Sequence, residues 1–147
     1  MKIGIGSDHA GFTYKRELIS TLRGLGHEVI DFGTFSDEPT DYPKWIRPVA
    51  LAVADGQVDR GIVLGGSGNG EAMVANRVRG VRCAYCFNEE SVRLARRHNN
   101  ANCISMGQRL IPLDMARSIV ELSLSEPFDG GRHQRRIDQI DDVPLTR

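Results

Sequence analysis

The stretch GIVLGGSGNGEAMVANRV, residues 61–78, joins a short apolar run to an amphipathic run through a loop that is rich in glycine. Four of the seven residues at its centre, 65–71, are glycine. An apolar run that passes directly into a helical pattern indicates a buried strand followed by a helix, the repeating unit of α/β proteins. The same order recurs on both sides of this stretch, so it decides the fold class expected for the whole chain.

Strand-like and helix-like segments alternate along the rest of the chain. Leu18, Leu22 and Leu25 recur at helical spacing, Asn88 is a suitable N-cap, and Pro48 is expected in or near the first turn of its helix, whose start the sequence does not define. The expected strands are 2–8, 27–33, 61–66, 81–87 and 103–107, and the expected helices are 14–26, 44–56, 69–78, 88–100 and 113–126. These alternations predict an α/β fold, a three-layer sandwich in which helices cover both faces of a five-stranded parallel sheet.

The composition is that of a soluble globular protein with one domain spanning 1–147. The chain is 40% hydrophobic and 26% charged, with 19 basic and 19 acidic residues. A net charge of zero argues against a general nucleic-acid binder or a protein that binds anionic membranes. No apolar run approaches the roughly 20 residues that span a bilayer, and the N-terminus resembles a buried strand rather than a signal peptide. We therefore expect a cytoplasmic protein with no nucleic-acid or membrane partner.

The three cysteines, Cys83, Cys86 and Cys103, are expected to be structural thiols. Their odd number and the size of the domain argue against a disulfide framework. Cys83 and Cys86 form a C-x-x-C pair, but the pair lies inside an expected strand, and zinc would require a second pair of ligands. A thiol redox protein stays open as a rival class.

Polar residues follow several of the expected strands. Asp8 and His9 follow the first strand, the glycine loop follows the third, and Arg109 follows the fifth. In parallel α/β sheets, ligands bind at the carboxyl ends of the strands, where the chain reverses its winding. These residues therefore mark the expected position of the site.

The glycine loop fits none of the common phosphate or nucleophile motifs. No lysine follows it as in a P-loop, Gly66, Gly68 and Gly70 have the wrong spacing for a dinucleotide fingerprint, and Asn69 replaces the last glycine of a nucleophile elbow. What remains is a run of backbone N–H groups at the start of a helix, which suits a phosphate or an oxyanion formed during a reaction. The alternative is a tight turn that binds no ligand.

Glu71 lies in the first turn of the helix that follows the loop. A helix N-terminus favours the ionised form of a carboxyl group, so we expect a carboxylate that can accept a proton. A base beside an oxyanion hole suits proton abstraction next to a carbonyl group. The alternative is that Glu71 only caps the helix.

Two further polar groups lie in the second half of the chain. His98 and Asn99 occur near an expected helix C-terminus. His98 is a candidate for proton transfer and Asn99 for hydrogen bonding to a ligand. The alternative is an ordinary polar helix end with an asparagine cap. Arg132 and Arg136 are four residues apart, so on a helix they share a face that suits a phosphate, unless they belong to a solvated charged tail. We expect the helical tail, about 129–147, to dock on its own domain or on a partner subunit.

Four segments in this order resemble the type B ribose-5-phosphate isomerases, which belong to a wider sugar-phosphate isomerase family that includes galactose-6-phosphate isomerase subunits. The segments are GSDHAGF (6–12), GIVLGGSGNGE (61–71), ARRHNNAN (95–102) and GGRHQRRID (130–138). The resemblance extends from about residue 2 to residue 138. The chain resembles the branch with a glutamate base, because Gly65 occupies the position at which the other branch has a catalytic cysteine.

The resemblance implies a Rossmann-like fold, a homodimer or tetramer whose subunits share each site, no metal or other cofactor, and conversion of ribose 5-phosphate to ribulose 5-phosphate through a cis-enediolate. It implies that Glu71 is the base and that His98 helps to open the sugar ring. The implied substrate-binding residues are Asp8, His9, Gly66, Ser67, Gly68, Asn69, Gly70 and Asn99, and the implied phosphate-binding residues are His9, Arg109, Arg132 and Arg136. Two rivals stay open: the same chemistry on a tetrose 4-phosphate or a hexose 6-phosphate (allose or galactose), and a phosphate-binding module without catalysis.

Overall fold

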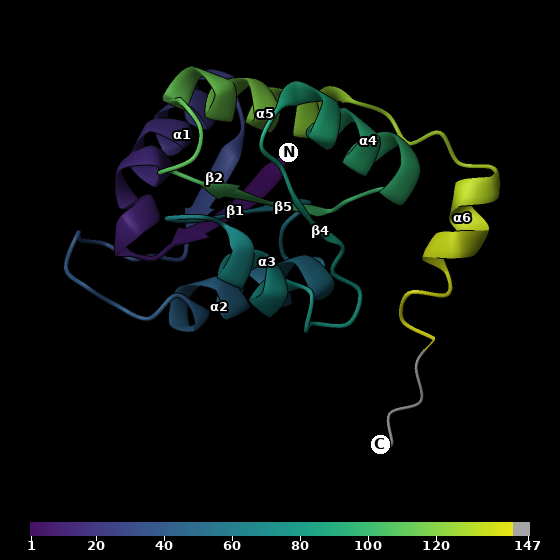
Figure 1. Cartoon of the computed structure of the whole chain (residues 1–147), viewed down its shortest axis with the longest axis horizontal. Helices are drawn as coiled ribbons and strands as arrows, with labels where there is room; N and C mark the ends of the chain where they lie inside the picture. The colour runs from purple at the N-terminus through teal and green to yellow at the C-terminus, as the bar shows by residue number, and fades with distance from the viewer. Residues whose placement is uncertain (143–147) are drawn as a thin grey trace.

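A five-stranded parallel sheet forms the centre of the protein (Figure 1). The computed structural model describes residues 1–142, so residues 143–147 of the expected domain and tail lie outside the described part. The strands are β1 (Lys2–Ser7), β2 (Glu28–Asp31), β3 (Arg60–Gly65), β4 (Cys83–Tyr85) and β5 (Cys103–Gly107), in the spatial order β2-β1-β3-β5-β4. Every neighbouring pair is parallel. The expected fold class is confirmed.

Helices cover both faces of this sheet. They are α1 (Phe12–Gly24), α2 (Pro43–Ala54), α3 (Asn69–Ala75), α4 (Glu89–Asn99), α5 (Leu113–Ser125) and α6 (Arg132–Ile137), and a short 3-10 helix, His9–Gly11, precedes α1. Helices α1, α4 and α5 lie on one face of the sheet, and α2 and α3 lie on the other (Figure 1). Among the described residues, no helix combines the length and the apolar character required to cross a membrane.

Each face of the sheet has its own hydrophobic core, because side chains alternate along a strand. Ile62 and Leu64 of β3 pack with α1, α4 and α5, whereas Val63 between them packs with α2 and α3. The expected helical stripe of α1 is correct for Leu18 and Leu22, which are fully buried. It is wrong for Leu25, which is 52% exposed because α1 ends at Gly24 and Leu25 caps the helix outside the core.

Helix α2 begins with proline and contains a second one. Pro43 occupies the first turn, where a missing N–H costs little. Pro48, which was expected in or near the first turn, lies inside the helix beyond that turn. The helix begins at the first proline and continues through the second.

Local hydrogen bonds define both ends of α4. The side chain of Asn88 accepts the N–H of Ser91 at 2.8 Å, and the Ser91 hydroxyl accepts the N–H of Asn88 at 3.2 Å, so the expected N-cap forms a capping box. At the other end, Asn100 has a left-handed backbone with φ 45°, which stops the helix immediately after Asn99. Asn88 as N-cap is therefore confirmed.

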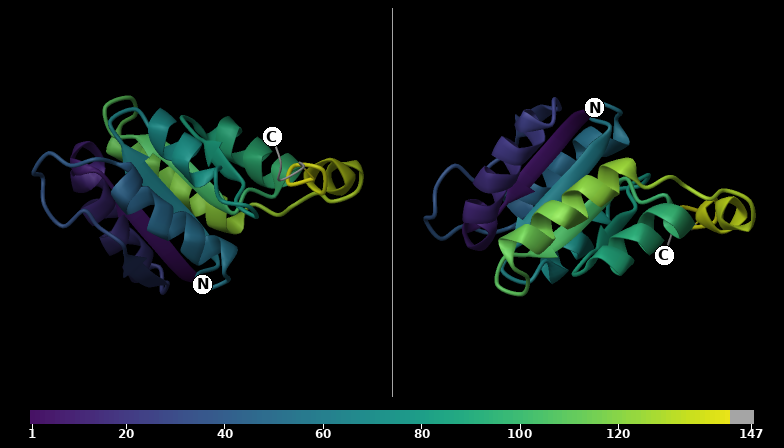
Figure 2. Two further views of the ribbon diagram at one scale, coloured as in Figure 1. Left: turned by 90° about the horizontal axis from the view of Figure 1, so that it is seen from below. Right: turned by 90° about the horizontal axis from the view of Figure 1, so that it is seen from above.

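Helix α6 projects from one end of the molecule. Figure 2 shows it at the opposite end from the long loop that joins β2 to α2. The segment before α6 is held on α4, because the Asp129 N–H donates to the Arg97 carbonyl oxygen at 3.0 Å. The tail therefore extends away from the core of its own chain.

Candidate active site

A cleft of about 420 Å³ opens at the carboxyl ends of β1, β3 and β5. The chain reverses its winding between β1 and β3, so the cleft lies where ligands bind in this class of sheet. Its walls are Asp8, His9, Ala10, Tyr42, Gly66, Ser67, Gly70, Glu71, Arg109 and Leu110. The structure therefore brings together most of the residues expected from the first half of the chain.

The glycine loop forms the floor of this cleft, and close contacts hold its shape. Gly68 has φ 84°, and a Cβ atom there would lie 2.8 Å from the Met106 carbonyl carbon. The buried Ser105 hydroxyl donates to the Gly68 carbonyl oxygen at 2.6 Å. Within residues 1–142, the backbone N–H groups of Gly66, Ser67 and Gly70 have no protein acceptor. The loop thus presents free donors to a ligand, as an oxyanion site requires.

Glu71 packs against the backbone of the strand that precedes the loop. The side chain is only 4% exposed. Its carboxylate occupies the space in which a side chain at Gly65 would lie, since an added Cβ would be 1.8 Å from Glu71 Oε1. A glutamate here therefore requires a glycine at position 65.

The pKa of Glu71 is raised above its ordinary value of 4.5, mainly because burial disfavours the charged form. The negative charge of Asp8 raises this pKa further, while the N–H groups of Glu71 and Gly68 lower it. The sequence argument expected the helix N-terminus to dominate and was wrong on the net direction. Helix α3 has only seven residues, and the loss of hydration outweighs the few N–H groups that it supplies. A raised pKa makes the carboxylate a stronger base.

Asp8 combines a structural bond with a free carboxylate oxygen. Its Oδ1 accepts the N–H groups of Ala10 at 2.9 Å and Gly11 at 3.1 Å, which caps the short 3-10 helix. The residue is only 8% exposed, yet it lines the cleft. Oδ2 is therefore the oxygen available to a hydroxyl group of a ligand.

The long loop between β2 and α2 orients His9. Nδ1 of His9 lies 3.1 Å from the Thr40 nitrogen and 3.2 Å from the Thr40 carbonyl oxygen. Thr40 is held in turn by Trp45, whose Nε1–H donates to the Thr40 hydroxyl at 2.9 Å. These contacts leave Nε2 of His9 as the ring nitrogen available to a ligand. Sequence reasoning missed Thr40 because a loop without periodicity gives no signal for its contacts.

Arg109 and Tyr42 complete the rim. The Arg109 N–H donates to the Gly66 carbonyl oxygen at 3.1 Å, and its guanidinium lies beside the glycine loop, with Nη1 3.1 Å from the position of a Cβ at Gly66. Within the described residues, no carboxylate lies within ion-pair distance of Arg109. Tyr42, which the sequence did not indicate, packs beside Gly70, since a Cβ added at Gly70 would lie 2.7 Å from Cζ of Tyr42 and 2.9 Å from its hydroxyl oxygen. The rim thus offers an unpaired cation beside free N–H groups.

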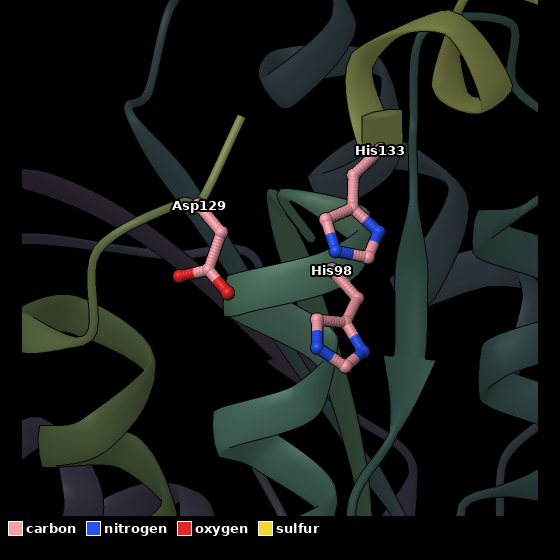
Figure 3. Close-up of side chains that lie close together, drawn as sticks. All are labelled: His98, Asp129 and His133. Atoms are coloured by element: carbon pink, nitrogen blue, oxygen red, sulfur yellow. The ribbon is translucent and has the colours of Figure 1, made fainter. Parts of the chain in front are cut away.

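The remaining expected site residues form a second cluster. His98, Asn99 and Arg136 line a separate cleft of about 370 Å³ together with His133, Ile137 and Ile140. The rings of His98 and His133 stack with centroids 4.4 Å apart, as Figure 3 shows. Partial burial and the neighbouring charges of His98, Arg132 and Arg136 lower the pKa of His133. Arg132 begins α6 and belongs to this region.

The two clusters lie at opposite ends of the strands, one at the carboxyl ends and one at the amino ends. Helix α4 runs antiparallel to the strands, so its last residues, His98 and Asn99, lie just before β5 begins, at the amino edge. Glu71 and Arg109 lie at the carboxyl edge, about 15–20 Å away by the length of one strand. Within a single chain, the structure therefore does not bring these two groups of expected site residues together. The order of helix, His98 and strand in the sequence already contained this information.

All three cysteines are buried and free. Burial raises the pKa of Cys86 to about 12. A hydrogen bond with Cys103, together with burial, raises the pKa of Cys83 well above its ordinary value. A redox thiol requires a lowered pKa, so the structural interpretation is supported and the thiol redox alternative is not.

Comparison with known proteins identifies the family of the chain. Residues 3–140 match the Ribose/Galactose Isomerase family. The chain belongs to this family. Ribose-5-phosphate isomerase B of Escherichia coli is 43% identical over 146 residues, which cover 99% of this chain and 98% of the relative. The structure of Clostridium thermocellum ribose-5-phosphate isomerase B superposes with a TM-score of 0.95 at 48% identity, covering 97% of this chain and 96% of the other.

A third member of the ribose/galactose isomerase family adds a ligand. The crystal structure of ribose-5-phosphate isomerase B from Mycoplasma genitalium with bound ribulose 5-phosphate has a TM-score of 0.92 and 38% identity, covering 96% of this chain and 94% of the other. The resemblance had placed the chain in a branch of this family with glutamate rather than cysteine as the base. The contact between Glu71 and Gly65 is consistent with that placement, because a side chain at position 65 and a glutamate at position 71 would compete for the same space.

Proposed function

We propose that the protein interconverts ribose 5-phosphate and ribulose 5-phosphate by proton transfer through a cis-enediolate. The observation that carries this proposal is a buried carboxylate, Glu71, with a raised pKa beside a loop whose free N–H groups face the same cleft. Relatives that bear the name ribose-5-phosphate isomerase B align over nearly the whole chain, which supports the same substrate.

In this mechanism the open-chain aldose binds with its carbonyl oxygen at the N–H groups of Gly66, Ser67 and Gly70. Glu71 removes the proton from C2, the electron pair of that C–H bond forms the C1–C2 double bond, and the carbonyl oxygen becomes the enediolate oxygen. The N–H groups stabilise the developing negative charge. Glu71 then returns the proton to C1, and the proton of the C2 hydroxyl group passes to the oxygen on C1, so that C2 becomes the ketone and C1 the alcohol. The substrate is neither oxidised nor reduced overall, so the mechanism needs no redox cofactor, and the N–H groups supply the charge stabilisation that a metal would otherwise give.

We further propose that two subunits share each site in a homodimer. Glu71, Asp8 and Arg109 lie at one edge of the sheet, and His98 with the tail lies at the other edge. In a dimer with two-fold symmetry, the end that carries His98 in each chain can meet the end that carries Glu71 in its partner, which gives two equivalent sites. The projecting position of α6 supports this arrangement, since a tail that leaves its own core is free to dock on another chain.

In the shared site, His98 of the second subunit acts in ring opening, and Asn99 binds the reacting oxygens. Arg132 and Arg136 from the second subunit join Arg109 and His9 around the phosphate. Arginines suit this role because their planar guanidinium groups bind phosphate oxygens in pairs. A cytoplasmic location belongs to the same proposal.

Turnover of ribose 5-phosphate with EDTA present tests the reaction. The wild type should convert it, and Glu71→Gln should lose about 10²–10⁴-fold in kcat, the usual contribution of a general base. Comparing kcat/KM for a tetrose 4-phosphate, ribose 5-phosphate and a hexose 6-phosphate then tests sugar length. A higher value for either rival would move the proposal to that substrate within the same family.

Mixing two inactive variants tests the shared site. Glu71→Gln and His98→Ala each damage both sites of a dimer, but a mixed dimer places both changes in one site and leaves the other intact. After random re-pairing, about a quarter of wild-type activity should return, because about half of the dimers are mixed and each has one intact site. If sites were built from one chain, mixing would restore nothing. Single variants taken through the same re-pairing provide the control.

A further inference from the structure

Three potential metal ligands meet beside α6. His98 at the end of α4, Asp129 in the segment before α6 and His133 within α6 each place one ligand atom within 4.8 Å of the others. Figure 3 shows the Asp129 carboxylate directed toward the two imidazole rings. Within residues 1–142, these three make up the group of histidine, cysteine, aspartate or glutamate side chains that lie close enough to share one metal ion. Neither Asp129 nor His133 has a role in the proposed isomerase reaction.

Backbone contacts hold the three groups together. The Asp129 N–H donates to the Arg97 carbonyl oxygen at 3.0 Å, which fixes the segment before α6 to the turn that carries His98. The His133 ring lies flat on the His98 ring, with an angle of 12° between their planes. The fold therefore brings the three side chains together, although the residues are up to 35 positions apart in the sequence.

The chemistry of the ligands selects the ion. Two imidazole nitrogens and one carboxylate oxygen form a common ligand set for Zn²⁺, which completes four-coordination with water. Magnesium and calcium prefer sets made of oxygen alone. We propose that His98, Asp129 and His133 bind Zn²⁺, and that the ion inhibits the enzyme reversibly. The ion has no part in the proposed reaction, but its site shares His98 with that reaction.

The surroundings predict that zinc binds weakly enough to exchange. Arg97 Nε lies 3.3 Å from Asp129 Oδ1, so one carboxylate oxygen is already paired and zinc must use the other or displace the arginine. Arg132 and Arg136 add positive charge nearby. The stacked rings must also turn about their Cβ–Cγ bonds, because imidazole lone pairs lie in the ring plane and two parallel planes do not meet at one ion. These costs fit an inhibitory site rather than a permanent structural one.

Inhibition rests on the proposed function of His98. An imidazole nitrogen that binds zinc cannot also accept or donate a proton, so a zinc-bound His98 cannot take part in ring opening. Zinc should therefore reduce turnover of the cyclic substrate, and EDTA should restore it.

Isothermal titration of the full-length protein with Zn²⁺ alone tests the site without reference to catalysis. The wild type should bind one ion per chain. Asp129→Asn and His133→Gln should each lower the affinity at least tenfold, since loss of even a second-shell partner costs about 10–100-fold. His27→Gln, which removes a histidine outside the cluster, should bind like the wild type. Circular dichroism establishes that each variant is folded.

Absence of saturable zinc binding in the wild type would overturn the site, as would unchanged affinity in both ligand variants.

The activity assay is a separate experiment: zinc should inhibit the wild type and His27→Gln, while Asp129→Asn and His133→Gln should resist inhibition. Equal inhibition of all four proteins would overturn the link between cluster and inhibition. Turnover that persists with zinc bound at this site would support the site and overturn the role of His98. Failure of the wild type to turn over ribose 5-phosphate would overturn the proposed function, whereas the titration would still decide the site.

Discussion

Gly65→Ala is the substitution whose effect follows most directly from the geometry of the site. A Cβ at position 65 would lie 1.8 Å from Glu71 Oε1 and 2.2 Å from its carboxyl carbon. The carboxylate has to move by about 1.2 Å merely to reach 3.0 Å, a separation that is still tight. A displacement of about 1 Å at a reacting group can cost 10²-fold in rate. We therefore expect Gly65→Ala to reduce kcat by about 10²-fold.

The same clash predicts a loss of stability that depends on Glu71. Overpacking a buried site usually costs about 1–3 kcal/mol, and we expect the lower end because a carboxylate at the end of a flexible side chain can yield. In a Glu71→Ala background the added methyl group meets no carboxylate, so the cost should disappear. A double-mutant cycle built from urea unfolding measures this coupling. Gly24→Ala is the matched control, because a Cβ there has no neighbour within 4 Å.

The result that would refute this reasoning is Gly65→Ala with wild-type kcat. That outcome would mean either that the Glu71 carboxylate does not occupy the position next to Gly65 or that its position there is irrelevant to the reaction. Equal loss of stability in the wild-type and Glu71→Ala backgrounds would place the strain elsewhere.

Three further substitutions test other parts of the account. Because burial raises the pKa of Glu71 above 4.5, the protonated carboxyl group favours folding at low pH, and this contribution is lost as the pH rises through the folded-state pKa. Glu71→Gln should therefore melt above the wild type at pH 8, and the two melting temperatures should converge below pH 4.5. A constant difference between them would contradict the raised pKa. Asp31→Ala should lower the free energy of unfolding by about 3 kcal/mol in chemical unfolding, because Lys15 is fully buried and its Nζ lies 2.5 Å from Asp31 Oδ1. A loss below about 1 kcal/mol, the size expected for an ion pair on the surface, would show that the buried ammonium group finds other partners. Arg136→Ala should raise KM far more than it lowers kcat, and a pure kcat effect would remove it from the phosphate site.

The sequence predicts the sheet and the cleft at the carboxyl ends of its strands well, because both depend on local patterns. Strand β5 has the predicted limits, 103–107, since a short, mostly apolar run that follows polar residues has one simple interpretation. Asp8, Glu71 and Arg109 meet because the carboxyl ends of parallel strands share one edge. That inference needs the order of elements only and no distances.

The parts that the sequence does not predict depend on contacts between distant segments. The bond between His9 and Thr40 arises from a loop without periodicity, and Tyr42 reaches the cleft from the same loop. The net shift of the Glu71 pKa depends on how deeply α3 and β3 bury the carboxylate, which residue spacing does not contain. His98 and Glu71 line separate clefts within the chain, so the site proposed to join them would need a second chain.

The central claim is that Glu71 is the base of an aldose–ketose isomerase. Turnover of ribose 5-phosphate by the wild type and by Glu71→Gln, side by side and with EDTA present, tests it most directly. The account predicts rapid conversion to ribulose 5-phosphate by the wild type and a loss of about 10²–10⁴-fold in kcat for the variant, with little change in KM. A Glu71→Gln enzyme that keeps its kcat and changes only KM would contradict the assignment of the base.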